Sequence, residues 1–222
     1  MRKTLKFTYF VALALMVPFL TPARSATPRY AQLDQSLTKY SQSPLVTLKV
    51  EEKQISGLLG QEKKVAGVVS LSKGKFRYDI KGNEDSMILF DGQYLWTVQY
   101  PNKDLGGRIQ VTKTRSGKVP NSQLILKLLG EPRNIYNQFT VKEESLNQEE
   151  LQYTLTPVNR KSNLRLIYIY LSKKTLQIQR LKYRDDVDNE VDLTIKDTDF
   201  VAKIAGGVFE FTPPKNAQVI EL

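Results

Sequence analysis

Cysteine and histidine are both absent from the 222-residue chain. Without them the chain has no disulfide, no thiol nucleophile and none of the Ser-His or Cys-His pairs that activate a nucleophile. The commonest zinc sites are excluded for the same reason, because their ligands are these two residue types. A bacterial lipid anchor also needs a cysteine at its attachment point, so we expect the chain to carry no lipid of its own.

Other patterns that support catalysis are also scarce. Carboxylates gather at residues 143–150 and 185–190, each between alternating sequences, and we interpret both groups as solvated hairpin turns. The second group could be a calcium loop, but it lacks the central glycine and the terminal bidentate glutamate of that motif. No glycine-rich phosphate loop is present. We therefore predict that the protein is not an enzyme and has no catalytic residue, metal or cofactor.

Residues 1–25 have the pattern of a secretory signal peptide. Three basic residues precede an apolar run at residues 7–20, and the small residues Ala23 and Ser25 fit cleavage after position 25. An uncleaved anchor is the alternative, although the apolar run is too short for a comfortable membrane span. We expect export, followed by folding of residues 26–222 as a single domain.

The chain is strongly basic, with a formal net charge of +10. Four of its basic residues belong to the expected signal peptide. A basic balance suits nucleic acid, an anionic membrane surface or an acidic partner. For an exported chain we predict no nucleic-acid partner, and we interpret much of the charge as a solvated outer face of a sheet.

An alternation of period two dominates the sequence after the signal peptide, which indicates β-strands. In the stretch 75–80, for example, Phe76, Tyr78 and Ile80 alternate with charged residues. Residues 164–171 are apolar almost throughout, so we expect that strand to be buried on both faces. With a final strand at residues 208–211, we count about eleven strands and predict a mainly β fold. We expect the strands to form an antiparallel meander that closes, or nearly closes, into a barrel.

Two stretches have helical features instead. The first, residues 28–43, repeats large apolar residues at spacings of three, four and three: Tyr30, Leu33, Leu37 and Tyr40. The second, residues 121–130, contains five large aliphatic residues and one charge. A short helix this apolar is unstable alone in water, so we expect it to be covered on more than one side.

The interior of such a sheet has two possible contents. Its side chains can fill the space completely, or they can leave a pocket for a hydrophobic ligand. The 11 tyrosines, 9 phenylalanines and single tryptophan suit either arrangement. From the residues alone, the filled core is the simpler interpretation.

Three motifs resemble the LolA family of periplasmic lipoprotein carriers. They are Gly-Lys-Phe-Arg-Tyr at 74–78, Asp-Gly-x-x-Leu-Trp at 91–96 and Phe-x-Phe-Thr-Pro-Pro at 209–214. The resemblance implies a curved, incomplete antiparallel β-barrel with a helical lid over a cavity for acyl chains. It also implies a monomeric periplasmic chaperone. An inner-membrane ABC transporter would release lipoproteins to it, and an outer-membrane acceptor would receive them.

Matching to the family places its lipid-binding positions on the strands and the lid. They fall on Phe76, Tyr78, Leu89, Leu95, Leu124, Ile125, Leu128 and Leu129. Each of these side chains could equally belong to an ordinary core. Two other functions therefore stay open: a carrier of another lipid or glycolipid, and an envelope sensor or scaffold that binds no lipid.

The chain departs from the family at the expected lid latch. Many members carry Arg-Pro just before the Gly-Lys-Phe-Arg strand, and that Arg is taken to hold the lid closed through main-chain carbonyls. Here Ser72 and Lys73 stand instead. A lysine offers a point charge without the planar fork of donors that arginine has. The departure suggests a lid that opens more easily, a different partner or a different lipid.

Overall fold

The computed structural model describes residues 30–82, 84–119, 125–130 and 135–222. The expected signal peptide lies outside these residues. Within them, one twelve-stranded sheet has the order β12-β6-β5-β4-β3-β2-β1-β11-β10-β9-β8-β7. The first six strands along the chain are β1 (Leu45–Ile55), β2 (Glu62–Ser72), β3 (Lys75–Lys81), β4 (Ser86–Phe90), β5 (Tyr94–Gln99) and β6 (Gln110–Arg115). The other six are β7 (Phe139–Ser145), β8 (Glu150–Pro157), β9 (Leu164–Ser172), β10 (Ile178–Asp185), β11 (Glu190–Val201) and β12 (Gln218–Glu221).

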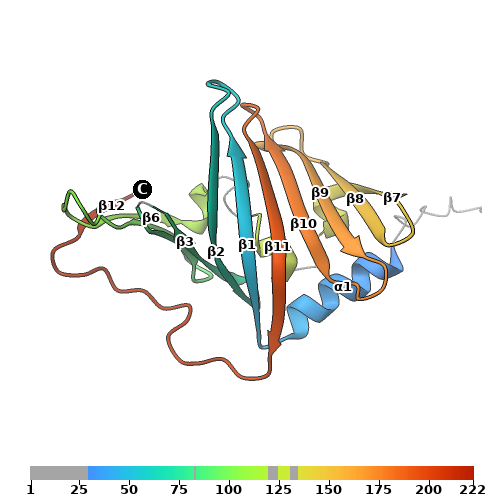
Figure 1. The fold of residues 1–222 in the computed structure, drawn as a ribbon, viewed down its shortest axis with the longest axis horizontal. Helices are drawn as coiled ribbons and strands as arrows, with labels where there is room; N and C mark the ends of the chain where they lie inside the picture. The colour runs from blue at the N-terminus through green and yellow to red at the C-terminus, as the bar shows by residue number, and fades with distance from the viewer. Residues whose placement is uncertain (1–29, 83, 120–124, 131–134) are drawn as a thin grey trace, which may run out of the picture.

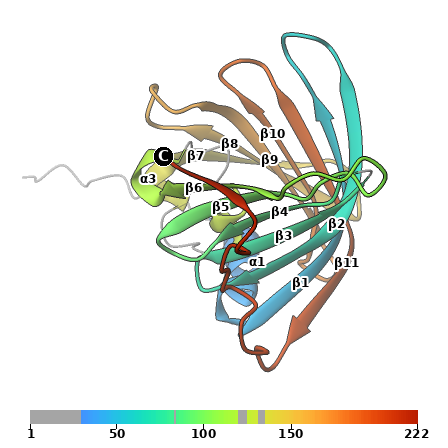
Figure 2. The same cartoon turned by 90° about the vertical axis from the view of Figure 1, so that its left-hand side faces the viewer.

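The sheet curves around a helix without closing, so the predicted mainly β, incomplete barrel is confirmed (Figures 1 and 2). Strands β7 and β12 form its two open edges. All neighbouring strands are antiparallel except β12, which pairs in parallel with β6. The chain therefore meanders from β1 to β6, and β11 then returns to lie beside β1.

The predicted last strand, at residues 208–211, is wrong. These residues form a turn and an irregular segment, and the last strand is β12. Phe209 and Phe211 instead pack on the outer face of the sheet, where the Phe211 ring lies 5.5 Å from that of Trp96. Figure 2 shows the C-terminal segment crossing this part of the sheet. The short alternating pattern thus marks side chains that cover a sheet, and it does not mark a strand.

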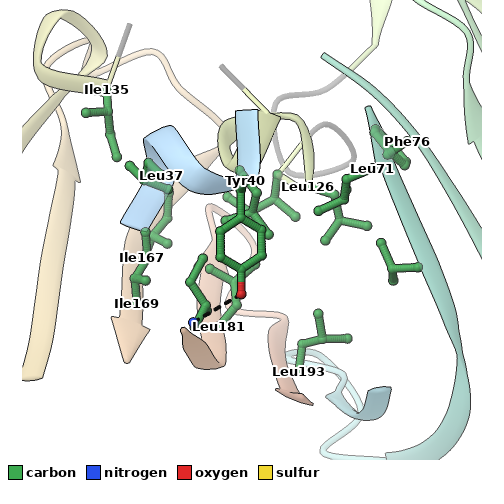
Figure 3. Close-up of a cluster of buried hydrophobic side chains, with 14 of the residues drawn as sticks. Leu37, Tyr40, Leu71, Phe76, Leu126, Ile135, Ile167, Ile169, Leu181 and Leu193 are labelled. Atoms are coloured by element: carbon green, nitrogen blue, oxygen red, sulfur yellow. Dashed lines mark hydrogen bonds between the residues drawn. The ribbon is translucent and has the colours of Figure 1, made fainter. Parts of the chain in front are cut away.

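Helix α1 (Ala31–Gln42) occupies part of the hollow of the sheet. Its predicted apolar stripe is confirmed, because Leu33, Leu37 and Tyr40 are at most 1% exposed. Figure 3 shows Leu37 and Tyr40 between side chains of β9 and β10 on one side and those of β2 and β3 on the other. The Tyr40 hydroxyl accepts a hydrogen bond from the Ile178 amide at 3.2 Å, which ties the helix to β10 (Figure 3).

Strand β9 departs from the expectation that both of its faces are buried. Ile167, Ile169 and Leu171 are fully buried under α1, whereas Tyr168 and Tyr170 are half-exposed on the outer face. The Arg180 guanidinium lies 5.4 Å from the centre of the Tyr170 ring. Tyrosine tolerates water at its hydroxyl end, and long polar side chains can shield its ring. The outer face therefore needs no second layer.

The predicted lid helix is described only in part. Residues 121–124 lie outside the described residues, Ile125 and Leu126 form a turn, and α2 spans Lys127–Gly130. A second short helix, α3 (Ile135–Gln138), leads into β7. Helix α2 lies against α1 and the β2–β3 hairpin. The described lid segment is therefore a single helical turn that lies on the concave side of the sheet.

The Asp-Gly turn between β4 and β5 is confirmed as a hairpin, with Gly92 at φ 103°. The Asp91 carboxylate accepts hydrogen bonds from the amides of Gln93 and Tyr94, each at 2.7 Å, and from the Trp96 indole N–H at 2.9 Å. Burial raises the pKa of Asp91, but these bonds and the nearby Lys75 charge outweigh burial and hold it below its ordinary value. The carboxylate thus fixes both the turn and the indole.

Replacing Tyr40 by Phe tests the tie between α1 and β10. The variant leaves the buried Ile178 amide without its acceptor, which costs about 1–3 kcal/mol. We expect the free energy of unfolding to fall by this amount in urea titrations followed by circular dichroism. The control is Tyr168→Phe on the half-exposed outer face, where a change below about 0.5 kcal/mol is expected. Equal effects of the two changes would contradict the assignment.

The variant Asp91→Asn tests the carboxylate at the hairpin. The amide can still accept bonds from the turn, but it cannot serve the turn and the Trp96 indole together, so a loss of about 1–3 kcal/mol is expected at pH 7. Because the folded-state pKa of Asp91 is lowered, its stabilising contribution is present above the unfolded pKa of about 3.9 and is lost as the pH falls through the folded value. The variant should therefore lose less stability on acidification than the wild type. Asp199→Asn, an exposed change on β11, should behave like the wild type.

Candidate functional site

A cavity of about 530 Å³ lies between the concave face of the sheet and the segment Ile125–Leu126. This volume falls within the range of about 300–1,000 Å³ that is usual for ligand sites. One wall comes from strands β3 to β5 and contains Phe76, Tyr78, Ile80, Ile88, Leu95 and Thr97. The facing wall comes from β10 and β11 and contains Leu181, Tyr183, Val191 and Leu193.

The cavity reaches the tips of two hairpins, β1–β2 and β10–β11, which lie side by side (Figure 1). The Gly57 amide donates a hydrogen bond to the Asn189 side-chain oxygen at 3.1 Å, which joins the two tips. A Cβ at Gly57 would lie 2.4 Å from the Val187 carbonyl oxygen, so this close approach requires glycine. The carboxylate of Asp185 accepts bonds from the amides of Val187 and Asn189. The expected hairpin turn at residues 185–190 is thus confirmed.

The cavity wall also contains polar side chains, among them Glu52, Gln54, Tyr78 and Tyr183. Glu52 is 7% exposed, and its carboxylate accepts a hydrogen bond from the Gln54 amide group. Burial raises the pKa of Tyr78 and of Tyr183, and the nearby Glu52 charge raises both further. Both phenols therefore stay neutral at physiological pH and keep their protons as hydrogen-bond donors.

The structure brings half of the predicted lipid-binding residues into the cavity wall. Phe76, Tyr78, Leu95 and Ile125 line it. Leu129 is fully buried in the adjoining core, and Leu128 packs against the same core while partly exposed. Leu124 lies outside the described residues.

Leu89 lies on the opposite face of the sheet. It is fully buried in a second cluster with Trp96, beneath the C-terminal segment. Its neighbour Ile88 points into the cavity instead, because successive side chains of a strand alternate between faces. Strand β4 is apolar on both faces, so the alternation could not decide which residue points inward. We therefore leave Leu89 out of the proposed lipid-binding set.

Several cavity residues were not predicted, among them Ile80, Leu126, Tyr183, Leu193 and Glu52. Ile80 continues the alternation of the β3 strand, and Leu126 belongs to the apolar lid stretch, so both could have been found. Glu52 also carried a signal. It is in phase with the inward residues of β1, whereas Glu51 is out of phase and exposed.

The two residues at the expected latch position lie away from the cavity lining. Ser72 is 4% exposed, and its hydroxyl donates to the Pro44 carbonyl oxygen at 2.6 Å. This bond ties the end of β2 to the segment between α1 and β1. Lys73 is exposed at the β2–β3 turn, with φ 42°. A lid latch at these positions stays a prediction.

Two further findings apply to the described part of the chain. None of its helices is long and apolar enough to span a membrane. No group of three or more Asp or Glu side chains there is arranged to hold a metal ion. The site is therefore defined by a largely apolar cavity, with polar groups in its wall, inside an open, curved β-sheet.

This architecture defines a half-barrel protein with an internal ligand-sized cavity. The chain belongs to the family of the outer membrane lipoprotein carrier protein LolA, which matches residues 36–212. The members of this family are carriers and not enzymes.

The chain is also similar to two known proteins, one in sequence and one in fold. The outer-membrane lipoprotein carrier protein of Legionella pneumophila (strain Lens) is 26% identical over 157 residues, which cover 70% of this chain and 73% of that protein. An uncharacterized conserved protein of Thermus thermophilus has a similar fold, with a TM-score of 0.50 at 12% identity, over 86% of this chain and 98% of that one.

Replacing Ile88 by Glu tests whether the cavity binds apolar molecules. A carboxylate in the cavity wall disfavours an apolar ligand, so we expect an environment-sensitive apolar dye to bind at least about tenfold more weakly. Val68→Glu is the matched control, because Val68 is 38% exposed on the outer face of β2. If dye titrations show the same loss of dye affinity in both variants, binding in the cavity is contradicted.

Proposed function

We propose that this protein is a periplasmic carrier that takes up the acyl chains of lipoproteins in the cavity and delivers them to the outer membrane. The observation that carries the proposal is the largely apolar cavity bounded by β1–β5, β10, β11 and Ile125–Leu126. A protein that moves acyl chains through water must cover them, and an apolar cavity of ligand size provides that cover.

The energetics of the proposed cargo favour a cavity that is neither closed nor rigidly filled. Burial of an acyl chain is worth about 0.8 kcal/mol per CH₂. A long chain therefore binds firmly, and release requires an acceptor that binds it more tightly. The cavity wall includes Ile125 and Leu126, which form a turn just before α2 and do not belong to a strand of the sheet. Movement of this segment would open the cavity without breaking the sheet.

The proposed route begins with export by the signal peptide in residues 1–25. An inner-membrane ABC transporter that releases lipoproteins would load the carrier, and an outer-membrane acceptor would receive the cargo. The similarity to the outer-membrane lipoprotein carrier protein of Legionella pneumophila supports this assignment of the cargo. We propose that the carrier acts as a monomer and belongs to outer-membrane biogenesis.

Native mass spectrometry of the protein purified from the periplasm tests this function. We expect complexes whose extra mass corresponds to an acylated lipoprotein, and Ile88→Glu should abolish them whereas Val68→Glu should retain them. A free lipid or glycolipid would instead establish a different cargo. A protein that stays empty when offered purified lipoprotein would contradict the proposal and favour the scaffold without a lipid ligand.

A further inference from the structure

The charge of the cavity is opposite in sign to that of the whole chain. The chain carries a formal net charge of +10. The charged side chains that line the cavity, however, are three carboxylates, Glu52, Asp185 and Glu190, and one ammonium, Lys63. Lys63 is exposed at the rim of the cavity. The acidic character of the interior is therefore a local feature that the overall charge does not explain.

Two of the three carboxylates bind other groups of the β10–β11 hairpin. Asp185 accepts bonds from the turn that it precedes. Glu190 pairs with the Lys182 ammonium at 3.0 Å and with the Arg184 guanidinium. Among the described residues, Glu52 forms no ion pair with a lysine or arginine. Its carboxylate accepts a hydrogen bond from the Gln54 amide group and lies beside the Tyr78 hydroxyl. Glu52 is thus the carboxylate that is available to a ligand.

The hydroxyl group of Tyr78 lies beside the Glu52 carboxylate. The Tyr78 side chain is only 4% exposed, and its hydroxyl makes no hydrogen bond of ordinary geometry with the described residues. Burial raises the pKa of Tyr78, and the charge and hydrogen bonding of the nearby acceptor, the Glu52 carboxylate, raise it further. Glu52 and Tyr78 both line the cavity, on strands β1 and β3. A buried polar group without a partner costs free energy, and a bound molecule that completes its hydrogen bonds recovers that cost.

We infer that Glu52 and the Tyr78 hydroxyl form a recognition site for the polar end of an acylated cargo that presents N–H donors, and that this site rejects anionic lipid head groups. The inference rests on the proposed binding of acyl chains in the cavity. The carboxylate accepts from an ammonium or an amide N–H, and the phenol donates to a neighbouring carbonyl oxygen. The acylated N-terminal end of a protein supplies both groups, whereas a phosphate supplies neither a donor nor a positive charge.

Rejection of anions follows from the same geometry. Two negative charges repel more strongly in a water-poor cavity than in bulk water, because the effective dielectric constant is lower. The site would repel an anionic lipid and attract a cargo with N–H donors, and both effects increase its specificity for the cargo. Membrane lipids with a net negative head group would therefore be disfavoured although their acyl chains suit the cavity walls.

Three probes with the same alkyl chain test this inference: dodecylamine, dodecanol and dodecanoate, each titrated calorimetrically at pH 7 below its micelle concentration. For the wild type we expect dodecylamine to bind about tenfold more tightly than dodecanoate, the size of one charge-assisted hydrogen bond. The variant Glu52→Gln keeps the shape of the side chain and should bring the two affinities within about threefold. Glu51→Gln, on the outer face where Glu51 pairs with Lys196 at 2.9 Å, should retain the wild-type preference.

The outcomes separate this inference from the proposed function. If the wild type binds all three probes with equal affinity, the recognition site at Glu52 and Tyr78 is contradicted, whereas binding of acyl chains in the cavity is supported. A preference for dodecylamine that persists in Glu52→Gln also overturns the role of Glu52. If none of the probes binds, the proposed function fails and the recognition site fails with it. The wild-type comparison is informative even if the Glu52 variant does not fold.

Discussion

The concave face of the sheet must be covered, and the helix that covers it is too small for the task. The sheet has twelve strands, whereas α1 has 12 residues and is therefore about 18 Å long. Its buried side chains fill the hollow beside β9 and β10 (Figure 3). Among the described residues, Ile125 and Leu126 are the ones outside the sheet and its hairpins that line the part of the hollow toward the β1–β2 and β10–β11 hairpins, and the cavity lies there. The ligand site is thus a consequence of a curved sheet with more apolar surface than its helix can bury.

On the outer face of the sheet, the apolar side chains of β4 and β5 are covered by the C-terminal segment. Strand β4 presents Met87 and Leu89 outward, and together with Trp96 they form a second apolar cluster. The C-terminal segment covers this cluster with Phe209 and Phe211, and β12 then anchors the segment by pairing with β6. Apolar surface is consequently available to a ligand on the concave side and not on this part of the outer face. The three carboxylates that line the cavity give this apolar space a polar character of its own.

Much of the fold could be predicted from local patterns. The alternation of apolar and charged residues identified the strands, the three-four-three spacing identified α1, and the Asp91-Gly92 pair identified the β4–β5 hairpin. The pattern failed where a short apolar segment covers a sheet without joining it, as at residues 208–211. It also failed for the outer face of β9, because tyrosine is counted as apolar although its hydroxyl remains in water.

The candidate site was only partly predictable, for a physical reason. Whether Ile88 or Leu89 faces the cavity depends on the register of β4 with its neighbours, and a strand that is apolar on both faces does not reveal it. The importance of Glu52 depends on its distance from any cation, which is a property of the folded sheet. By contrast, Phe76, Tyr78 and Leu95 follow from the alternation and from the motifs shared with the family.

The most direct test of the account is the position of the acyl chain in the loaded protein. Because the chain has no cysteine, a single one can be introduced at Thr97 in the cavity wall or at Val68 on the outer face, and labelled with a fluorophore that reports polarity. On addition of a purified acylated lipoprotein, we predict a blue shift and quencher protection at position 97 with no change at position 68. The reverse pattern, or an equal response at both positions, would contradict binding inside the curved sheet.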